Sequence, residues 1–214
     1  MKERSQELEL LDLGPCYYSR EEYSDCLEKL YRIGNLTGIN QESLSLIKKI
    51  APSSIVDVGC GGGLFLRGLA ATFAEIQCIG IDCAKEAIDF AKPYEQNNLS
   101  FFCTKEIPPA DVVMATLVLH HLRDAELPEF LEKCYQAANK AVIINDLQRS
   151  RTSKALYKLI SRWLFSNRLI SHDGAISIAR GFRKGELRQL FSPFEQVEIR
   201  WRVPFRWQVI IWKR

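Results

Sequence analysis

Glycines occupy four of the five positions from Gly59 to Gly63, between an apolar run at 54–58 and a helical pattern that begins at Leu64. Without Cβ atoms, such a segment can turn tightly and lie directly against a ligand. The N-terminus of the following helix offers free N–H groups and a partial positive charge. The segment therefore predicts a binding loop for a ligand that carries a carboxylate or a phosphate.

A single acidic residue, Asp82, ends the next apolar run, IQCIGID at 76–82. A carboxylate at a strand end can accept hydrogen bonds from both hydroxyls of a ribose. The dinucleotide pattern GxGxxG would place its third glycine at position 64, where this chain has leucine. The two motifs together predict a nucleoside ligand and disfavour a nicotinamide dinucleotide.

Over about residues 50–214 the sequence resembles the class I S-adenosylmethionine-dependent methyltransferases. The resemblance is carried by DVGCGGG at 57–63, GID at 80–82 and ADVVMATLVLHHL at 110–122. It implies S-adenosylmethionine as cofactor, with Asp57 at the methionine amino group and Asp82 at the ribose. By this likeness, the residues around the cofactor are Asp57, Gly59, Cys60, Gly61, Gly63, Asp82, Cys83, Ala115, Thr116 and Leu117.

The adenine end departs from the family, which often has an acidic residue after the third strand. This chain has Phe102, Cys103 and Thr104 there. We expect these three residues to line the adenine site, with Phe102 stacking on the base and Thr104 hydrogen-bonding to it. The alternative for Phe102 is a buried apolar strand end.

The chemistry that the resemblance implies needs neither a metal nor a covalent residue, because the sulfonium already activates the methyl group. A general base could still assist transfer to a hydroxyl or an acidic carbon. The histidines His120, His121 and His172 are predicted in loops near the ligand edge and are the candidates for this role. The alternatives are plain loop structure for the first two, and a surface hydrogen bond or helix cap for His172.

The acceptor is predicted to be small and lipophilic. No (D/N/S)PP(Y/F) tetrad follows the fourth predicted strand, which disfavours methylation of a nucleobase or glutamine nitrogen. The fuller pattern, with Arg149 and Arg151 after the fifth strand, resembles quinone- and polyketide-type O- or C-methyltransferases. The predicted acceptor contacts are Tyr17, Tyr18, Asp146, Arg149, Tyr157 and Trp163. Packing is the alternative for the four aromatic residues.

The elements that must position these residues form an α/β pattern. Residues 1–50 read as a helical preface, and residues 51–214 alternate short apolar runs with helices, which predicts a doubly wound, Rossmann-like, mostly parallel sheet. Segments 194–202 and 205–214 predict a closing antiparallel hairpin, and the resemblance implies seven strands. An insert at about 148–182 contains a basic amphipathic helix, which we expect to cover the acceptor.

Charge is distributed unevenly along the chain. Residues 1–147 carry 14 Lys and Arg against 22 Asp and Glu, whereas residues 148–214 carry 15 against 4. This bias keeps open a methyltransferase that acts on RNA or protein. The missing acidic residue at the adenine site and the basic helix keep open a non-catalytic nucleoside-binding or membrane-surface protein of the same fold. Nucleic acid is not the favoured partner.

The apolar runs of the sequence are too short for a membrane helix. The seven cysteines are scattered and form no CxxC pair, which predicts reduced thiols and no metal centre. We therefore expect a cytosolic protein.

Overall fold

The computed structural model describes residues 3–164 and 166–213, with side chains described for all of these except residues 162–164. Seven strands form one sheet: β1 (Ser54–Val58), β2 (Gln77–Asp82), β3 (Leu99–Cys103), β4 (Ala110–Thr116), β5 (Ala138–Leu147), β6 (Val197–Arg202) and β7 (Arg206–Trp212). The α-helices are α1 (Arg20–Leu36), α2 (Ile39–Ile50), α3 (Leu64–Thr72), α4 (Lys85–Ala91), α5 (Leu127–Ala137), α6 (Arg151–Leu164), α7 (Arg168–Arg180) and α8 (Lys184–Leu190). Three short 3₁₀ turns are η1 (Leu11–Leu13), η2 (Lys92–Tyr94) and η3 (Leu119–His121).

The strand order is β3-β2-β1-β4-β5-β7-β6. Strands β1 to β5 pair in parallel, and β7 pairs antiparallel with both β5 and β6. This confirms the predicted mostly parallel sheet with a C-terminal hairpin. The order reverses between β1 and β4, and ligands of open α/β sheets bind beyond the strand ends at such a switch point.

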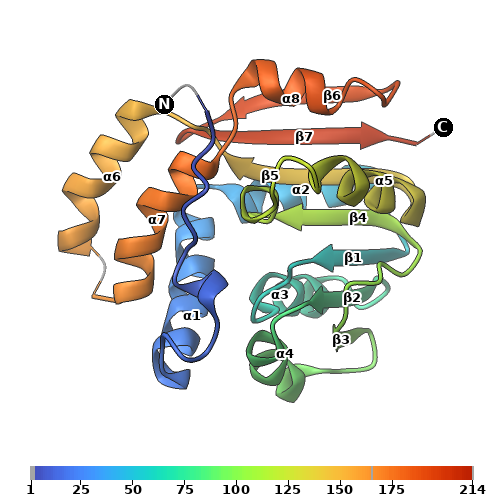
Figure 1. Cartoon of the computed structure of the whole chain (residues 1–214). Coiled ribbons are helices and arrows are strands. Elements are labelled where there is room, and N and C mark those ends of the chain that lie inside the picture. Colours follow the sequence, from blue (N-terminus) through green and yellow to red (C-terminus); the bar gives the residue numbers. More distant parts are fainter. Residues whose placement is uncertain (1–2, 165, 214) are drawn as a thin grey trace.

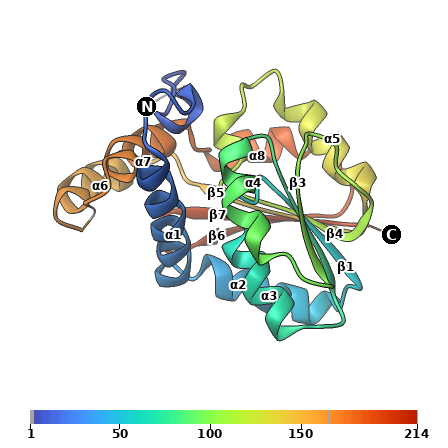
Figure 2. The same ribbon diagram turned by 90° about the horizontal axis from the view of Figure 1, so that it is seen from below.

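Helices cover both faces of the sheet, and neighbouring strand residues alternate between the two cores. Val56 points into the core shared with α5 and α8, whereas Ile55 points into the core shared with α2, α3 and α4. Figure 2 shows α2 and α3 on the side of the sheet opposite α5 and α8. Because both faces are buried, the central strands are apolar throughout, as is usual in parallel sheets.

The parallel strands all end at the side of the sheet where the N-terminal segment, α1 and α7 lie (Figure 1). Helix α1 begins with a capping box, in which Ser19 accepts the N–H of Glu22 and the Glu22 side chain accepts the N–H of Ser19. Cys26 of α1 packs against Leu169 and Ile170 of α7. The two helices thereby lie along the edge of the sheet at which the parallel strands end and the strand order reverses.

The predicted insert is a pair of helices rather than one. Helix α6 packs against α7, and it lies outermost in both views (Figures 1 and 2). Asn167 caps α7, since its side chain accepts the N–H of Ile170. None of the helices in the described part of the chain combines the length and apolarity needed to cross a bilayer.

Candidate active site

The glycine segment forms the turn from β1 into α3, as predicted. Gly59 has a φ of 71°, and a Cβ at this position would lie 2.5 Å from the side chain of Val118. The N–H of Gly61 donates to the carboxylate of Asp82 at 2.9 Å. The turn is therefore fixed by the end of β2 and leaves no room for a side chain at Gly59.

Asp57 lies at the end of β1, just before this turn. It is buried, and its Oδ1 has no hydrogen-bond partner among the residues that the structure describes. Burial, reinforced by the negative charge of Asp82, raises the pKa of Asp57 to about 7. A buried acceptor without a partner is costly in a folded protein, so it points to a donor supplied by a ligand.

Two cavities meet at the turn. The smaller, about 180 Å³, lies between the glycine turn and helices α1 and α2, and the larger, about 420 Å³, lies between the ends of β1, β2 and β3 and helix α5. Gly59 lines both cavities. One elongated ligand could therefore occupy both by passing along the backbone of Gly59.

Most of the predicted cofactor residues line these cavities. In the smaller one they are Asp57, Gly59, Cys60, Gly61, Thr116 and Leu117. In the larger one they are Gly59, Asp82, Cys83 and Thr104. The residues that the resemblance names thus line two neighbouring cavities that share Gly59.

Four predicted cofactor residues lie outside both linings. Gly63 faces Phe101, since a Cβ there would lie 2.3 Å from that ring. Ala115 is fully buried in the sheet. Phe102 is 47% exposed beneath the ammonium of Lys92, and the Cys103 thiol is directed towards the carbonyl of Cys83. Gly63 and Ala115 shape the site by packing, whereas the exposure of Phe102 and Cys103 comes from their place at the end of the edge strand β3.

Sequence reasoning missed the walls contributed by distant helices. The smaller cavity is also lined by Leu27, Leu30, Tyr31, Ile39 and Asn40 of α1 and α2, together with Gly34, Gly62, Leu64 and Phe65. Residues of α5 and the segment after β3 complete the larger cavity, including Lys105, Ile107, Phe130 and Lys133. The apolar stripe of α1 was visible in the sequence, but the pattern does not say which surface the stripe covers.

Tyr23 of α1 was also missed. Burial, followed by the charge of Asp82, raises the pKa of its hydroxyl. The ring of Tyr18 stacks on it with centroids 5.1 Å apart, while Tyr17 is half exposed. Tyr18 and Tyr23 therefore pack against each other, and neither lines the two cavities at the glycine turn.

The three predicted histidines do not form one group. His120 and His121 share η3, directly after the cavity-lining Val118, whereas His172 lies half exposed on α7 beside Asp173. Among the described residues, none of the three histidines belongs to the lining of either cavity. Their role as proton acceptors stays a prediction.

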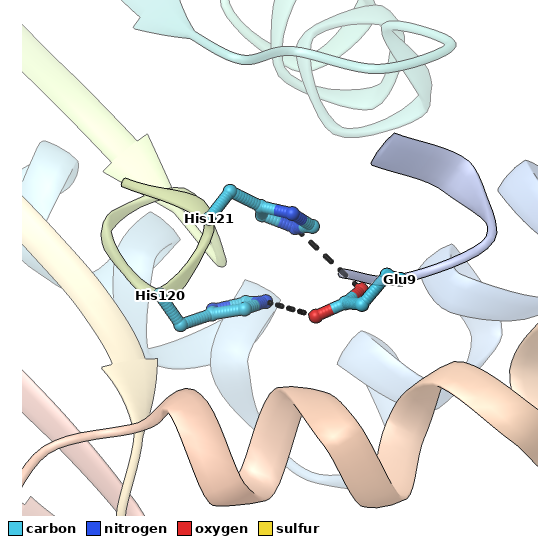
Figure 3. A group of neighbouring side chains, drawn as sticks. All are labelled: Glu9, His120 and His121. Atoms are coloured by element: carbon cyan, nitrogen blue, oxygen red, sulfur yellow. Dashed lines mark ion pairs between the residues drawn. The ribbon is translucent and has the colours of Figure 1, made fainter. Parts of the chain in front are cut away.

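His120 and His121 each pair with a carboxylate. The Nδ1 of buried His120 lies 2.8 Å from Oδ1 of Asp146, and the Nδ1 of His121 lies 2.8 Å from Oδ1 of Asp12. The other ring nitrogens face Glu9 (Figure 3). Burial, opposed by the charge of His121, raises the pKa of Glu9 to about 7.

Other predicted acceptor contacts have partners within the protein. Arg149 is buried, donates to the carbonyl of Gly181 and pairs with Glu186. The hydroxyl of Tyr157 donates to the carbonyl of Ile170 in α7, so this ring packs within the helix pair. The side chain of Trp163 lies outside the described residues.

A cavity of about 510 Å³ lies apart from the glycine turn, between the N-terminal segment, α5 and α8. It contains Arg4 and Glu186, each already paired with an oppositely charged residue. The unpartnered Asp57 and the glycine turn therefore mark the smaller cavity, rather than this one, as the candidate site.

Comparison with known proteins agrees with this geometry. Residues 56–141 match the family model described as a methyltransferase domain. Over 97 residues the chain is 34% identical to (RS)-norcoclaurine 6-O-methyltransferase of Thalictrum flavum subsp. glaucum, a match that covers 44% of this chain and 28% of that protein. The isoflavone 7-O-methyltransferase of Glycyrrhiza echinata is 34% identical over 89 residues, covering 40% of this chain and 24% of its own. The chain thus spans less than a third of the length of these curated relatives.

Solved structures share the fold over most of the chain. Human N-acetylserotonin methyltransferase in complex with SAM has a TM-score of 0.68 at 16% identity, covering 92% of this chain and 57% of that one. The plantazolicin methyltransferase BpumL in complex with SAH has a TM-score of 0.66 at 18% identity, covering 94% and 91%. Residues 56–141 thus resemble a methyltransferase domain, and most of the chain shares the fold of solved methyltransferase structures.

Proposed function

We propose that this protein transfers a methyl group from S-adenosylmethionine to an oxygen of a small-molecule acceptor. The observation that carries the proposal is the buried, unpartnered Oδ1 of Asp57 beside the glycine turn. An α-amino group is cationic at neutral pH and donates hydrogen bonds, so the methionine part of the cofactor supplies what this carboxylate lacks.

The remaining cavity residues fit the other parts of the cofactor. Both oxygens of Asp82 accept a backbone N–H, from Gly61 and Ala84, and each oxygen keeps a lone pair for a ribose hydroxyl. Thr104 lines the larger cavity, which has room for a planar base beside Ile107. Gly59 lies between the two ends, since it lines both cavities.

When bound, the cofactor supplies an activated methyl group. The chain must then align the acceptor oxygen and exclude water, and good alignment alone can lower a barrier by about 7–11 kcal/mol. Leu27, Leu30 and Leu117 line the smaller cavity and give it an apolar wall that keeps water out. This wall also supports the preference for a lipophilic acceptor.

The choice of oxygen as the methylated atom is supported by the relatives, whose names specify O-methylation of norcoclaurine and an isoflavone. That the protein belongs with the quinone- and polyketide-type methyltransferases stays a prediction. The two alternatives, methylation of RNA or protein and a non-catalytic nucleoside-binding protein, also stay predictions, and the comparisons favour neither. A cytosolic location belongs to the same proposal, supported by the free state of all seven cysteines.

Calorimetric titration with S-adenosylmethionine and S-adenosylhomocysteine tests the cofactor assignment. We expect binding by the wild type and at least tenfold weaker binding by Asp57→Asn, which keeps the size of the side chain but removes its charge. Asp89→Asn is the matched control, because Asp89 pairs with Lys85 on the exposed side of α4. Equal affinity of Asp57→Asn and the wild type would contradict the proposal, and methyl transfer to a panel of phenols would then be tested separately.

A further inference from the structure

Three side chains from distant parts of the sequence converge beside η3. Figure 3 shows Glu9 of the N-terminal segment facing the rings of His120 and His121. The Nε2 of His120 lies 3.7 Å from Oε1 of Glu9, and the Nε2 of His121 lies 3.9 Å from Oε2. One ligand atom from each residue lies within 4.8 Å of the other two.

These separations are too long for hydrogen bonds, which join nitrogen and oxygen at about 2.7–3.2 Å. They are close to the spacing of atoms that share an ion. Two ligands bonded to a tetrahedral metal at about 2.0–2.2 Å lie roughly 3.4 Å apart. The two histidine–glutamate separations exceed this value by a few tenths of an ångström, and all three ligand atoms lie within 4.8 Å of one another.

The surroundings orient both imidazoles for this arrangement. Asp146 holds the Nδ1 of His120 and Asp12 holds the Nδ1 of His121, each at 2.8 Å. A histidine that ligates a metal usually binds a carboxylate or carbonyl through its other nitrogen, which fixes the ring and its tautomer. Both rings have this partner, and both Nε2 atoms remain directed towards Glu9.

The charge of the cluster favours a cation. Three carboxylates, those of Glu9, Asp12 and Asp146, lie beside the two histidines. A fourth, that of Asp173, accepts the backbone N–H groups of Leu10 and Leu11, which follow Glu9 in the chain. One guanidinium, that of Arg180, pairs with Asp12. Within the part of the chain that the structure describes, the four carboxylates therefore outnumber the single guanidinium that pairs with them.

A second guanidinium lies nearby but is paired elsewhere. Arg4 donates to the carbonyls of Leu119, His120 and Leu122 and pairs with the exposed Asp124. It binds the backbone of η3, and among the described residues Arg180 is the only arginine or lysine that pairs with a carboxylate of the cluster.

We propose that Glu9, His120 and His121 bind a divalent first-row transition metal ion. Two imidazole nitrogens and one carboxylate suit ions such as Zn²⁺ or Co²⁺, whereas Mg²⁺ and Ca²⁺ prefer oxygen ligands throughout. Three protein ligands leave at least one coordination position open. His121 is 31% exposed, which gives the ion a path from solvent. The site goes beyond methyl transfer and does not depend on it.

The proposal also separates two roles of the histidines. A nitrogen that coordinates a metal cannot accept a proton, so a metal at this site excludes His120 and His121 as general bases through Nε2. A general base and a metal ligand would each be lost on replacing His120 or His121, but only metal binding also requires Glu9.

Titration of chelator-treated protein with Co²⁺, followed by visible absorption, tests the site. We expect one equivalent to bind with ligand-field bands, Zn²⁺ to displace it, and Mg²⁺ to leave the spectrum unchanged. His121→Ala and Glu9→Gln should each weaken Co²⁺ binding at least tenfold. His172→Ala is the matched control, because His172 also pairs through Nδ1 with a carboxylate, that of Asp173, but is not one of the three proposed ligands.

Circular dichroism and S-adenosylhomocysteine binding verify that each variant is folded. Equal Co²⁺ affinity in the wild type and His121→Ala would overturn the proposal. So would a near-ultraviolet thiolate charge-transfer band, which would assign binding to exposed cysteines such as Cys83 and Cys103.

Discussion

The carboxylate of Asp82, the last residue of β2, accepts the backbone N–H of Gly61 in the turn after β1 at 2.9 Å. The residue assigned to the ribose therefore also holds the glycine turn in shape before any ligand arrives. Preorganisation of this kind lowers the entropic cost of binding. It also means that one side chain contributes to affinity in two ways.

Replacing Asp82 should consequently reduce cofactor affinity strongly. We expect Asp82→Ala to weaken S-adenosylhomocysteine binding at least tenfold, since hydrogen bonds to charged groups contribute about 1.5–3 kcal/mol each. Calorimetry measures the loss, with Asp89→Ala as the exposed control on α4. An unchanged dissociation constant for Asp82→Ala would remove Asp82 from the binding site.

Cofactor affinity should rise with pH around neutrality. Asp57 has a pKa raised to about 7, so it is mostly neutral at pH 6 and ionised at pH 8. Only the ionised form pairs with a cationic amino group, and binding should therefore strengthen as pH increases from 5.5 to 7.5. Asp57→Asn should lose this dependence in calorimetric titrations over the same interval. A parallel pH profile in wild type and variant would contradict the pairing.

The raised pKa of Asp57 also makes the stability of the ligand-free protein depend on pH, and here a rise in pH is unfavourable. The folded pKa of Asp57 exceeds its ordinary value of 3.8, so folding favours the protonated carboxyl. This contribution to stability is present below pH 3.8 and is lost as pH rises through about 7. We expect Asp57→Asn to be more stable than the wild type at pH 8, and the difference to shrink at pH 5. Urea denaturation at both values measures it.

Gly59 should tolerate no side chain. Gly59→Ala combines a left-handed backbone with a Cβ placed 2.5 Å from Val118, and we expect a loss of about 1–3 kcal/mol in unfolding free energy together with loss of cofactor binding. Gly185→Ala is the matched control in α8, where a Cβ meets open space and should be neutral or stabilising by about 0.5–1 kcal/mol. Urea denaturation compares the two. Equal stability would mean that the turn can rearrange.

The helix pair α6–α7 should depend on Tyr157 for stability. Its hydroxyl donates to the carbonyl of Ile170, and Tyr157→Phe should cost about 0.5–1.5 kcal/mol without changing S-adenosylhomocysteine affinity. Thermal unfolding and calorimetry provide the two readouts. A fall in cofactor affinity with unchanged stability would instead favour a role for Tyr157 at the active site.

Much of the sheet and the cofactor path could be predicted because their determinants are local. Asp57, the glycine turn and Asp82 each stand directly at the end of an apolar run, and parallel strand ends meet at one edge. The C-terminal hairpin was likewise visible as two short apolar segments. In such places the local pattern and the tertiary structure agree.

Contacts between distant segments could not be predicted in the same way. Glu9 meets His120 across more than a hundred positions, and no spacing in the sequence signals that encounter. Helix α7 was missed because it is buried on most sides, so its apolar residues show no simple period. Asn167 was an available sign of its start, since its side chain caps the helix.

Arg4 donates to carbonyls of residues 119–122 and of Arg180, and the N–H of Ser5 donates to the carbonyl of Ala179. The N-terminal segment is thereby joined to η3 and to the end of α7. During biosynthesis these N-terminal residues leave the ribosome long before their partners exist. The edge that holds Glu9 against His120 can therefore form only after α7 has been made. Until then Arg4 and Glu9 lack these partners, and this corner assembles only after the five parallel strands β1 to β5 have been synthesised.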